Sequence, residues 1–291
     1  MKRSTEISPS LQPNLHHIDW FEYYKSLELG LIDLILTDPP YSILEKHRDW
    51  DQKIDLYSLE NSIDHVLKQN GLAIIFCNLW LKQDLINSFT KFQLRSWHIW
   101  RKPSAMPVND KQPLPNCEFV LVYKKKGIRT KDTTWNPLEM VPPKDPYIKK
   151  SNILTSPSRR HIKSQFSVNE SGKRWVPIII DAPHKPCMLK EERSNHPSQK
   201  PESLLRMLIR GYSNKGDFVF DPFAGSGSTL ISAYKECRGS SGCEIIEEYF
   251  LDASERIEVQ TSQQQLFSSC NIKVDEKHEN KKILDTQVSG Y

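Results

Sequence analysis

The stretch DPFAGSGST, residues 221–229, decides the fold because of what stands on either side of it. The apolar run at 217–220 predicts a buried strand before it, and 228–236 predicts a helix after it. Glycines let the backbone turn tightly and approach a ligand, and the amino end of a helix presents free N–H groups. A turn with a purely structural role is the alternative. A kinase-type phosphate loop is excluded because the Gly-Lys-Ser/Thr ending is missing.

A carboxylate follows at the position where such a site needs one. Glu244 lies in the next expected strand, 242–246, seventeen residues after Gly227. A Rossmann-type site places a carboxylate here to accept hydrogen bonds from ribose hydroxyls. The combination favours a nucleoside cofactor over a structural turn.

A second motif, DPPY at residues 38–41, comes directly after the buried strand expected at 31–36. Asp38 and the carbonyl of Pro39 can both accept hydrogen bonds from an exocyclic amino group, and Tyr41 offers a ring for stacking. Pro40 makes the backbone rigid between them. An Asp-Pro turn with a core tyrosine is the alternative interpretation.

Regular elements flank an irregular middle. Apolar patterns predict strands at 31–36, 72–77, 94–100 and 118–123 and helices at 58–68, 81–89, 201–211 and 247–259. The polar run after Gln260 predicts a poorly ordered tail. This succession is typical of an α/β fold.

The middle of the chain is rich in proline and basic residues. Fourteen of the 19 prolines lie between Pro103 and Pro201, which disfavours long helices and central strands there. Residues 128–190 hold twelve bases against five acids, a net of +7, whereas the whole chain carries +4. Such a segment suits a polyanion partner, and a solvated basic surface is the alternative.

Several classes of protein are excluded by composition. The apolar runs have strand length, so no bilayer-spanning helix is expected, and the amino terminus lacks the apolar stretch of a secretory signal. The six cysteines form no Cys-x-x-Cys pair, so neither a zinc site nor a disulfide framework is indicated. We therefore expect a cytoplasmic protein.

The order of the motifs along the chain is also informative. DPPY at 38–41, HPSQKP at 196–201, DPFAGSGST at 221–229 and Glu244 resemble the ordered motifs of amino-group DNA methyltransferases from restriction-modification systems and phages. With the catalytic motif first and the cofactor loop last, the order is similar to the β class. The resemblance covers nearly all of residues 15–260.

The resemblance implies S-adenosylmethionine as cofactor, double-stranded DNA as partner and no metal. It implies a Rossmann-like methyltransferase fold: an α/β structure with a mixed, mostly parallel sheet of seven strands and an inserted target-recognition region. The expected parts are a catalytic half (1–127), the insert (128–193), a cofactor-binding half (194–260) and a flexible tail (261–291). A cognate restriction endonuclease and a homodimer are left open.

The resemblance also assigns site residues. Those expected at the target base are Asp38, Pro39, Pro40 and Tyr41. Those expected at the cofactor are Asp19, Ser198, Lys200, Asp221, Phe223, Gly225, Gly227 and Glu244. Those expected at DNA phosphates are Arg159, Arg160, Lys163, Lys173 and Arg174. Asp19 departs from the family pattern, because His17-Ile18-Asp19 stands where relatives have Gly-Asp.

The target base is the least determined point. Adenine N6 and cytosine N4 are both exocyclic amines, and relatives with Asp in the first position of the tetrapeptide resemble adenine enzymes, so Asp38 favours adenine. Cytosine N4 is the alternative. An RNA or protein methyltransferase and a non-catalytic DNA-binding relative are the other interpretations.

Overall fold

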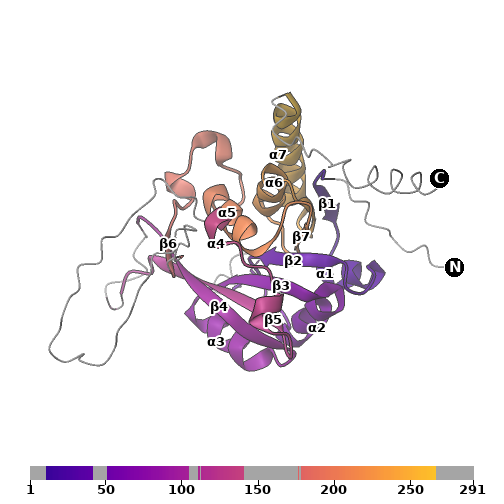
Figure 1. Ribbon diagram of the computed structural model, residues 1–291. Coiled ribbons are helices and arrows are strands. Elements are labelled where there is room, and N and C mark those ends of the chain that lie inside the picture. Colours follow the sequence, from indigo (N-terminus) through magenta and orange to yellow (C-terminus); the bar gives the residue numbers. More distant parts are fainter. Residues whose placement is uncertain are drawn as a thin grey trace, which may run out of the picture.

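One mixed sheet organises the molecule (Figure 1). The computed structural model describes residues 11–41, 51–104, 111, 113–140, 176 and 178–266. The strands are β1 (Asn14–His17), β2 (Ile32–Thr37), β3 (Leu67–Cys77), β4 (Phe92–Arg101), β5 (Cys117–Lys125), β6 (Ile179–Asp181), β7 (Phe218–Asp221) and β8 (Gly239–Glu244). The α-helices are α1 (Trp20–Tyr23), α2 (Leu56–Val66), α3 (Leu79–Ser88), α4 (Pro137–Met140), α5 (Glu202–Tyr212), α6 (Ser228–Lys235) and α7 (Glu247–Leu266).

The strand order is β1-β8-β7-β2-β3-β5-β4-β6. Strand β5 runs antiparallel to both of its neighbours, β3 and β4, and every other pair in the sheet is parallel. This arrangement confirms the expected Rossmann-like α/β fold with a mixed, mostly parallel sheet.

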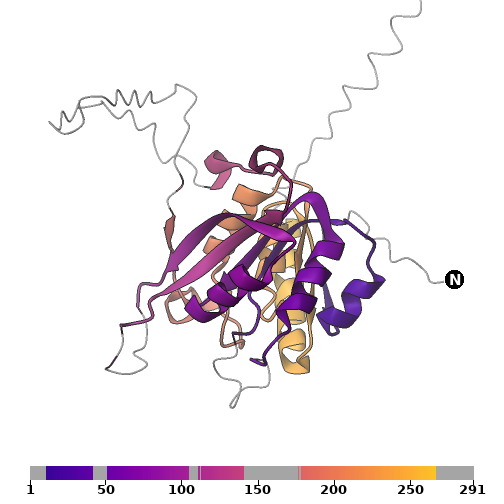
Figure 2. The ribbon, with the colours of Figure 1, turned by 90° about the horizontal axis from the view of Figure 1, so that it is seen from below.

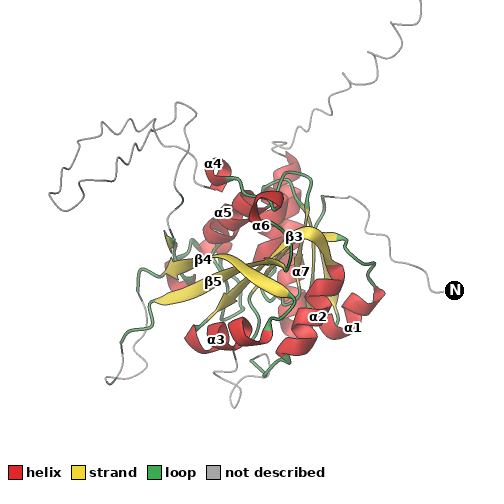
Figure 3. Cartoon of the chain, turned by 60° about the horizontal axis from the view of Figure 1, so that its bottom comes forward, coloured by secondary structure: helices red, strands yellow, loops and turns green. Residues whose placement is uncertain are grey.

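Helices cover both faces of the sheet (Figure 3). Helices α2 and α3 pack on one face of the sheet, and α4 and α5 pack on the other. Figure 2 shows the molecule from below, with the helices of the first face in front of the sheet. Each helix presents an apolar stripe to the sheet, such as Leu59 and Ile63 on α2 and Leu204 and Leu208 on α5. Central strands buried on both faces therefore read as continuous apolar runs in the sequence.

Two parallel strands at the centre place the site. Strands β2 and β7 are neighbours, with Leu34 opposite Val219 and Ile35 opposite Phe220. From β7 the chain continues through α6 to β8 on one side, and from β2 through α2 to β3 on the other. The carboxyl ends of β2 and β7 thus flank a topological switch point, where α/β folds bind ligands.

The sheet has eight strands among the described residues, whereas seven were expected. The additional strand, β6, comes from the end of the expected insert and pairs with β4, where Ile180 is buried. The proline-rich composition disfavoured a central strand there. A three-residue edge strand is compatible with such a segment because only one of its sides must pair.

Helix α7 is longer than expected. It continues to Leu266, through the first part of the stretch predicted to be a flexible tail. Thr261 is buried within it and its hydroxyl donates to the carbonyl of Ile257. The polar composition of the glutamine run at 263–265 predicted that the helix would end before it. Glutamine is a good helix former, however, and the run extends the helix. The rest of the expected tail, 267–291, lies outside the described residues.

Both ends of the expected insert pack on the main domain. Trp135 packs against Tyr212 with 5.0 Å between the centres of the tilted rings, and Asn136 donates to the carbonyl of Ser213. Residues 141–175 and 177 lie outside the described part, and with them all five predicted DNA-binding residues, 159, 160, 163, 173 and 174. No described helix has both the length and the apolar character needed to cross a bilayer.

Candidate active site

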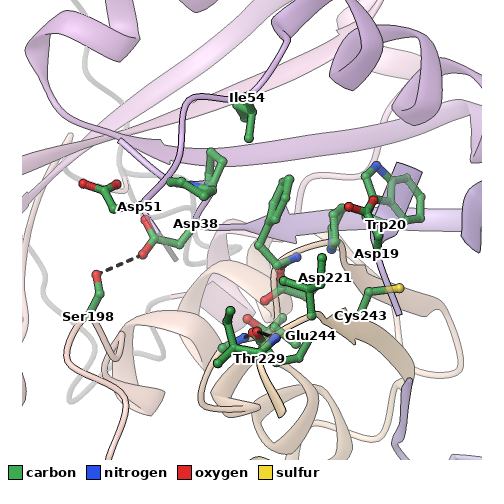
Figure 4. A pocket seen from close by; sticks show the side chains of 18 of the residues that line it. Asp19, Trp20, Asp38, Asp51, Ile54, Ser198, Asp221, Thr229, Cys243 and Glu244 are labelled. Carbon is green, nitrogen blue, oxygen red and sulfur yellow. Dashed lines mark hydrogen bonds between the residues drawn. The ribbon is translucent and has the colours of Figure 1, made fainter. Parts of the chain in front are cut away.

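A cavity of about 830 Å³ opens at the carboxyl ends of the central strands. Figure 4 shows Asp38, Asp51 and Ser198 on one side of it and Asp19 and Cys243 on the other. Of the predicted base and cofactor residues, the cavity is lined by Asp19, Asp38, Pro39, Pro40, Tyr41, Ser198, Lys200, Asp221, Phe223, Gly225 and Glu244. Residues of both predicted motifs therefore line one cavity.

Gly227 is the predicted residue that does not line this cavity. It precedes α6 with a φ of 70°, in the left-handed region where a side chain is strained. A Cβ added to it would lie 3.2 Å from the side chain of Ile257 and 3.3 Å from that of Ala253. Gly227 thus permits the turn and the close packing of α7.

Gly225 shapes the pocket side of the same turn. Its φ of 50° is also left-handed, and a Cβ there would lie 3.2 Å from the His196 ring. Burial lowers the pKa of His196 to about 4, so its ring is neutral at pH 7. Sequence reasoning did not select His196, although it opens the motif HPSQKP.

Glu244 ties the glycine turn to the end of β8. Its two carboxylate oxygens accept from Gly225 N at 2.9 Å and from Ile246 N at 2.8 Å. Burial raises the pKa of this carboxyl, and the backbone N–H groups of Ile246, Gly225 and Ile245 counteract the rise by favouring the charged form. A carboxylate has about four lone-pair sites, so Glu244 keeps acceptor capacity for ligand hydroxyls.

Asp19 lies at the amino end of α1. Its side chain accepts from Phe21 N at 2.6 Å and so caps this short helix. The cap places Asp19 on the wall of the cavity that Glu244 also lines, without the glycine of the family pattern.

Asp221 links the two central strands. Its carboxylate accepts from the Thr37 hydroxyl at 2.6 Å and from Phe223 N at 3.1 Å. Burial raises the pKa of Asp221 to about 6. Because Thr37 directly precedes Asp38, this hydrogen bond joins the glycine turn to the DPPY motif.

Asp38 is held by three side chains. Tyr41 donates its hydroxyl to Oδ1 at 2.6 Å, Lys200 forms an ion pair with Oδ2, and the Ser198 hydroxyl lies 3.5 Å from Oδ2. Burial raises the pKa of Asp38, and the neighbouring Lys200 ammonium opposes the rise. Ser198 and Lys200 were expected near the cofactor, whereas in this structure both contact the carboxylate of the DPPY motif.

Two acids of the site were not found from the sequence. Asp51 is buried and accepts from Tyr41 N at 2.7 Å, which fixes the backbone of the tetrapeptide. Glu118, at the start of β5, contacts Tyr41 and Lys200. The expected strand at 118–123 gave a weak signal for Glu118, but only the antiparallel pairing of β5 with β3 brings that end of the strand to the pocket.

With this geometry, comparison with known proteins defines the class. A family model described as DNA methylase, which covers N6 and N4 methyltransferases, matches residues 32–255. The match spans most of the chain, so the protein belongs to this DNA methylase family. The resemblance to amino-group DNA methyltransferases is confirmed.

Particular relatives agree with this family. The type II methyltransferase M1.MboII of Moraxella bovis is 26% identical over 264 residues, covering 82% of this chain and 94% of the relative. The DNA adenine methyltransferase YhdJ of Escherichia coli K12 is 28% identical over 258 residues, covering 84% of this chain and 82% of the relative.

Solved structures establish the fold independently. The crystal structure of the M1.HpyAVI–SAM complex has a TM-score of 0.57 at 24% identity, covering 84% of this chain and all of its own. The cytosine-N4-specific PvuII DNA methyltransferase has a TM-score of 0.61 at 16% identity, covering 88% of this chain and 93% of its own. Both support the expected methyltransferase fold.

Proposed function

We propose that this protein transfers a methyl group from S-adenosylmethionine to the N6 amine of adenine in double-stranded DNA. The observation that carries the proposal is the meeting of Asp38 and Tyr41 with the glycine turn and Glu244 in one cavity. The family supports methylation of an amino group in DNA. The expected cytoplasmic location is consistent with a DNA methyltransferase.

The residues of the pocket fit S-adenosylmethionine. Glu244 has acceptors left for ribose hydroxyls, Asp19 and Phe223 line the same wall, and Gly225 leaves its backbone open to the cavity. When bound, this cofactor supplies an electrophilic methyl group on a sulfonium. The volume of about 830 Å³ is within the range of cofactor pockets.

The DPPY motif would activate the target amine. An amino group on a base is a poor nucleophile because its lone pair is delocalised into the ring. Hydrogen bonds from its two N–H groups to Asp38 and to the Pro39 carbonyl favour a more pyramidal nitrogen. Burial raises the pKa of Asp38, which makes the carboxylate a stronger acceptor. Tyr41 would stack on the base after the nucleotide flips out of the duplex.

Adenine is the preferred base because the tetrapeptide begins with Asp38. Its relative YhdJ is named a DNA adenine methyltransferase. Cytosine N4 is the alternative, supported by the likeness to the PvuII enzyme in fold.

The insert would recognise DNA. Residues 128–193 include Arg159, Arg160, Lys163, Lys173 and Arg174, whose charges suit phosphate contacts. The name of M1.MboII, a type II methyltransferase, supports a restriction-modification context with a cognate endonuclease.

A direct test uses the purified protein, methyl-labelled S-adenosylmethionine, and duplex DNA or RNA of equal sequence. We expect label in the duplex DNA alone. Asp38→Ala should abolish transfer while leaving cofactor affinity nearly unchanged, because Asp38 faces the base. Equal loss of transfer and cofactor affinity would contradict the assignment of Asp38.

A further inference from the structure

Both carboxylate oxygens of Asp38 already have donors. Tyr41 OH donates to Oδ1 at 2.6 Å, and Lys200 Nζ is paired with Oδ2. A carboxylate has about four lone-pair sites, and a third donor, the Ser198 hydroxyl, lies 3.5 Å from Oδ2. If Asp38 accepts the amino group of a target base, as the proposed function requires, the incoming N–H enters a carboxylate crowded by three donors, and a shift of Tyr41 or Lys200 makes room for it. A buried donor that is displaced without a new acceptor carries a desolvation penalty.

The two donors share a second acceptor. Glu118 Oε2 lies 3.3 Å from Tyr41 OH and 3.5 Å from Lys200 Nζ. Among the described residues, Asp38 and Glu118 are the ion-pair partners of Lys200. The Lys200 ammonium also lies over aromatic rings, 5.4 Å from the centre of Phe76 and 5.9 Å from that of Trp100. Such rings stabilise the cation over a short range of positions without fixing its hydrogen bonds.

Glu118 is held in place from the other side. Lys102 Nζ donates to its Oε1 at 2.5 Å, which leaves Oε2 directed to Tyr41 and Lys200. Burial disfavours the charged carboxylate, but the Lys200 and Lys102 ammoniums outweigh it and hold the pKa of Glu118 below its ordinary value. Burial likewise disfavours the charged form of Lys200, and the two carboxylates raise its pKa. Glu118 is thus an ionised acceptor beside an ammonium.

We propose that Glu118 is a positioning residue for methyl transfer: it accepts the Lys200 ammonium, and the Tyr41 hydroxyl, when Asp38 releases them to bind the target amino group. The inference rests on the proposed function. Lys200 stays paired throughout the exchange, so Asp38 becomes available without leaving a buried charge alone. Glu118 need not contact the base or the cofactor.

The substitution Glu118→Gln tests this role. It keeps the size of the side chain but removes the charge that would receive Lys200. We expect kcat for duplex DNA to fall about 10- to 100-fold, the loss associated with one charge-assisted hydrogen bond. The KM for DNA and the Kd for S-adenosylmethionine, measured by titration calorimetry, should stay near the wild-type values. Glu118→Asp, which retains the charge, should recover part of kcat.

The pH profile separates positioning from a structural role. The titratable groups around Asp38 are Tyr41, Cys77, Glu118, Lys200 and Asp221. Of these, the Glu118 charge raises the pKa of Asp38. Glu118→Gln should therefore move the acid limb of kcat to lower pH. A variant that merely loosens packing would lose activity with the limb unmoved.

Asp64→Asn is a matched control. Asp64 also pairs with two lysines, Lys91 at 3.2 Å and Lys125 at 3.0 Å, but it does not line the cavity. We expect its kcat and acid limb to resemble those of the wild type.

A wild-type kcat in Glu118→Gln, or a lower kcat with the acid limb in place, would overturn the positioning role. If Glu118→Gln does not fold, Glu118→Asp must show a reduced kcat with unchanged cofactor affinity, and a wild-type kcat in it would overturn the role equally. A wild-type protein that methylates no DNA would instead contradict the proposed function.

Discussion

Glu244→Gln is the sharpest perturbation of the proposed cofactor site. The carboxylate accepts from Gly225 N and Ile246 N, one on each oxygen. Glutamine has one acceptor oxygen, so its NH2 group must face one of these N–H donors or turn away. A buried donor left without an acceptor costs about 1–3 kcal/mol. The same change removes an acceptor for a ribose hydroxyl, which should weaken cofactor binding by about 5- to 150-fold.

Isothermal titration with S-adenosylmethionine measures the affinity, and urea denaturation measures the free energy of unfolding. Glu247→Gln is the matched control, because this exposed glutamate lies three residues further along and does not line the cavity. We expect Glu244→Gln to lower both quantities and Glu247→Gln to change neither. An unaltered Kd for Glu244→Gln would refute the placement of the ribose at Glu244.

Three further predictions concern stability and DNA binding. Because the folded pKa of His196, about 4, is below its ordinary 6.5, protons favour the unfolded chain; stability should fall as pH drops from 6.5 to 4. Between pH 7 and 5 the wild type should lose about 2 kcal/mol more than His196→Gln in urea denaturation, and parallel losses would contradict the shift. Gly242→Ala would place a Cβ 2.8 Å from the Asp221 carbonyl oxygen, so the free energy of unfolding should drop by about 1–3 kcal/mol. An unchanged free energy of unfolding would mean that strand β8 shifts to accommodate the added methyl group. Replacing both Arg159 and Arg160 by Ala should reduce the salt slope of DNA binding by about one per lost phosphate contact, and an intact slope would show that both are solvated.

Buried parallel strands are the part of the fold that the sequence predicts best. The strand expected at 31–36 is observed at Ile32–Thr37, because both of its faces are covered and four of its six residues, Ile32, Leu34, Ile35 and Leu36, are fully buried apolar side chains. Strand β6 escapes such reasoning, since three residues at an edge have no periodicity of their own and pair only through tertiary contacts.

The site residues likewise fall into those that the sequence predicts and those that only the fold reveals. Asp38, Gly225 and Glu244 stand in local motifs at strand ends, so their types and spacing indicate their chemistry. The contact of Glu118 with Lys200 joins residues far apart in the chain and depends on the sheet order. No local pattern carries that information, and the pairing of Lys200 with Asp38 and Glu118 was therefore not predicted from its motif.

The pocket is proposed to methylate an amino group of a base in DNA. The most direct measurement is mass spectrometry of nucleosides from duplex DNA incubated with the purified protein and S-adenosylmethionine, with Asp38→Ala in parallel. We expect N6-methyladenine with the wild type and none with the variant. N4-methylcytosine in its place would overturn the choice of base alone, whereas unmodified DNA under conditions in which the wild type binds both cofactor and DNA would contradict the claim.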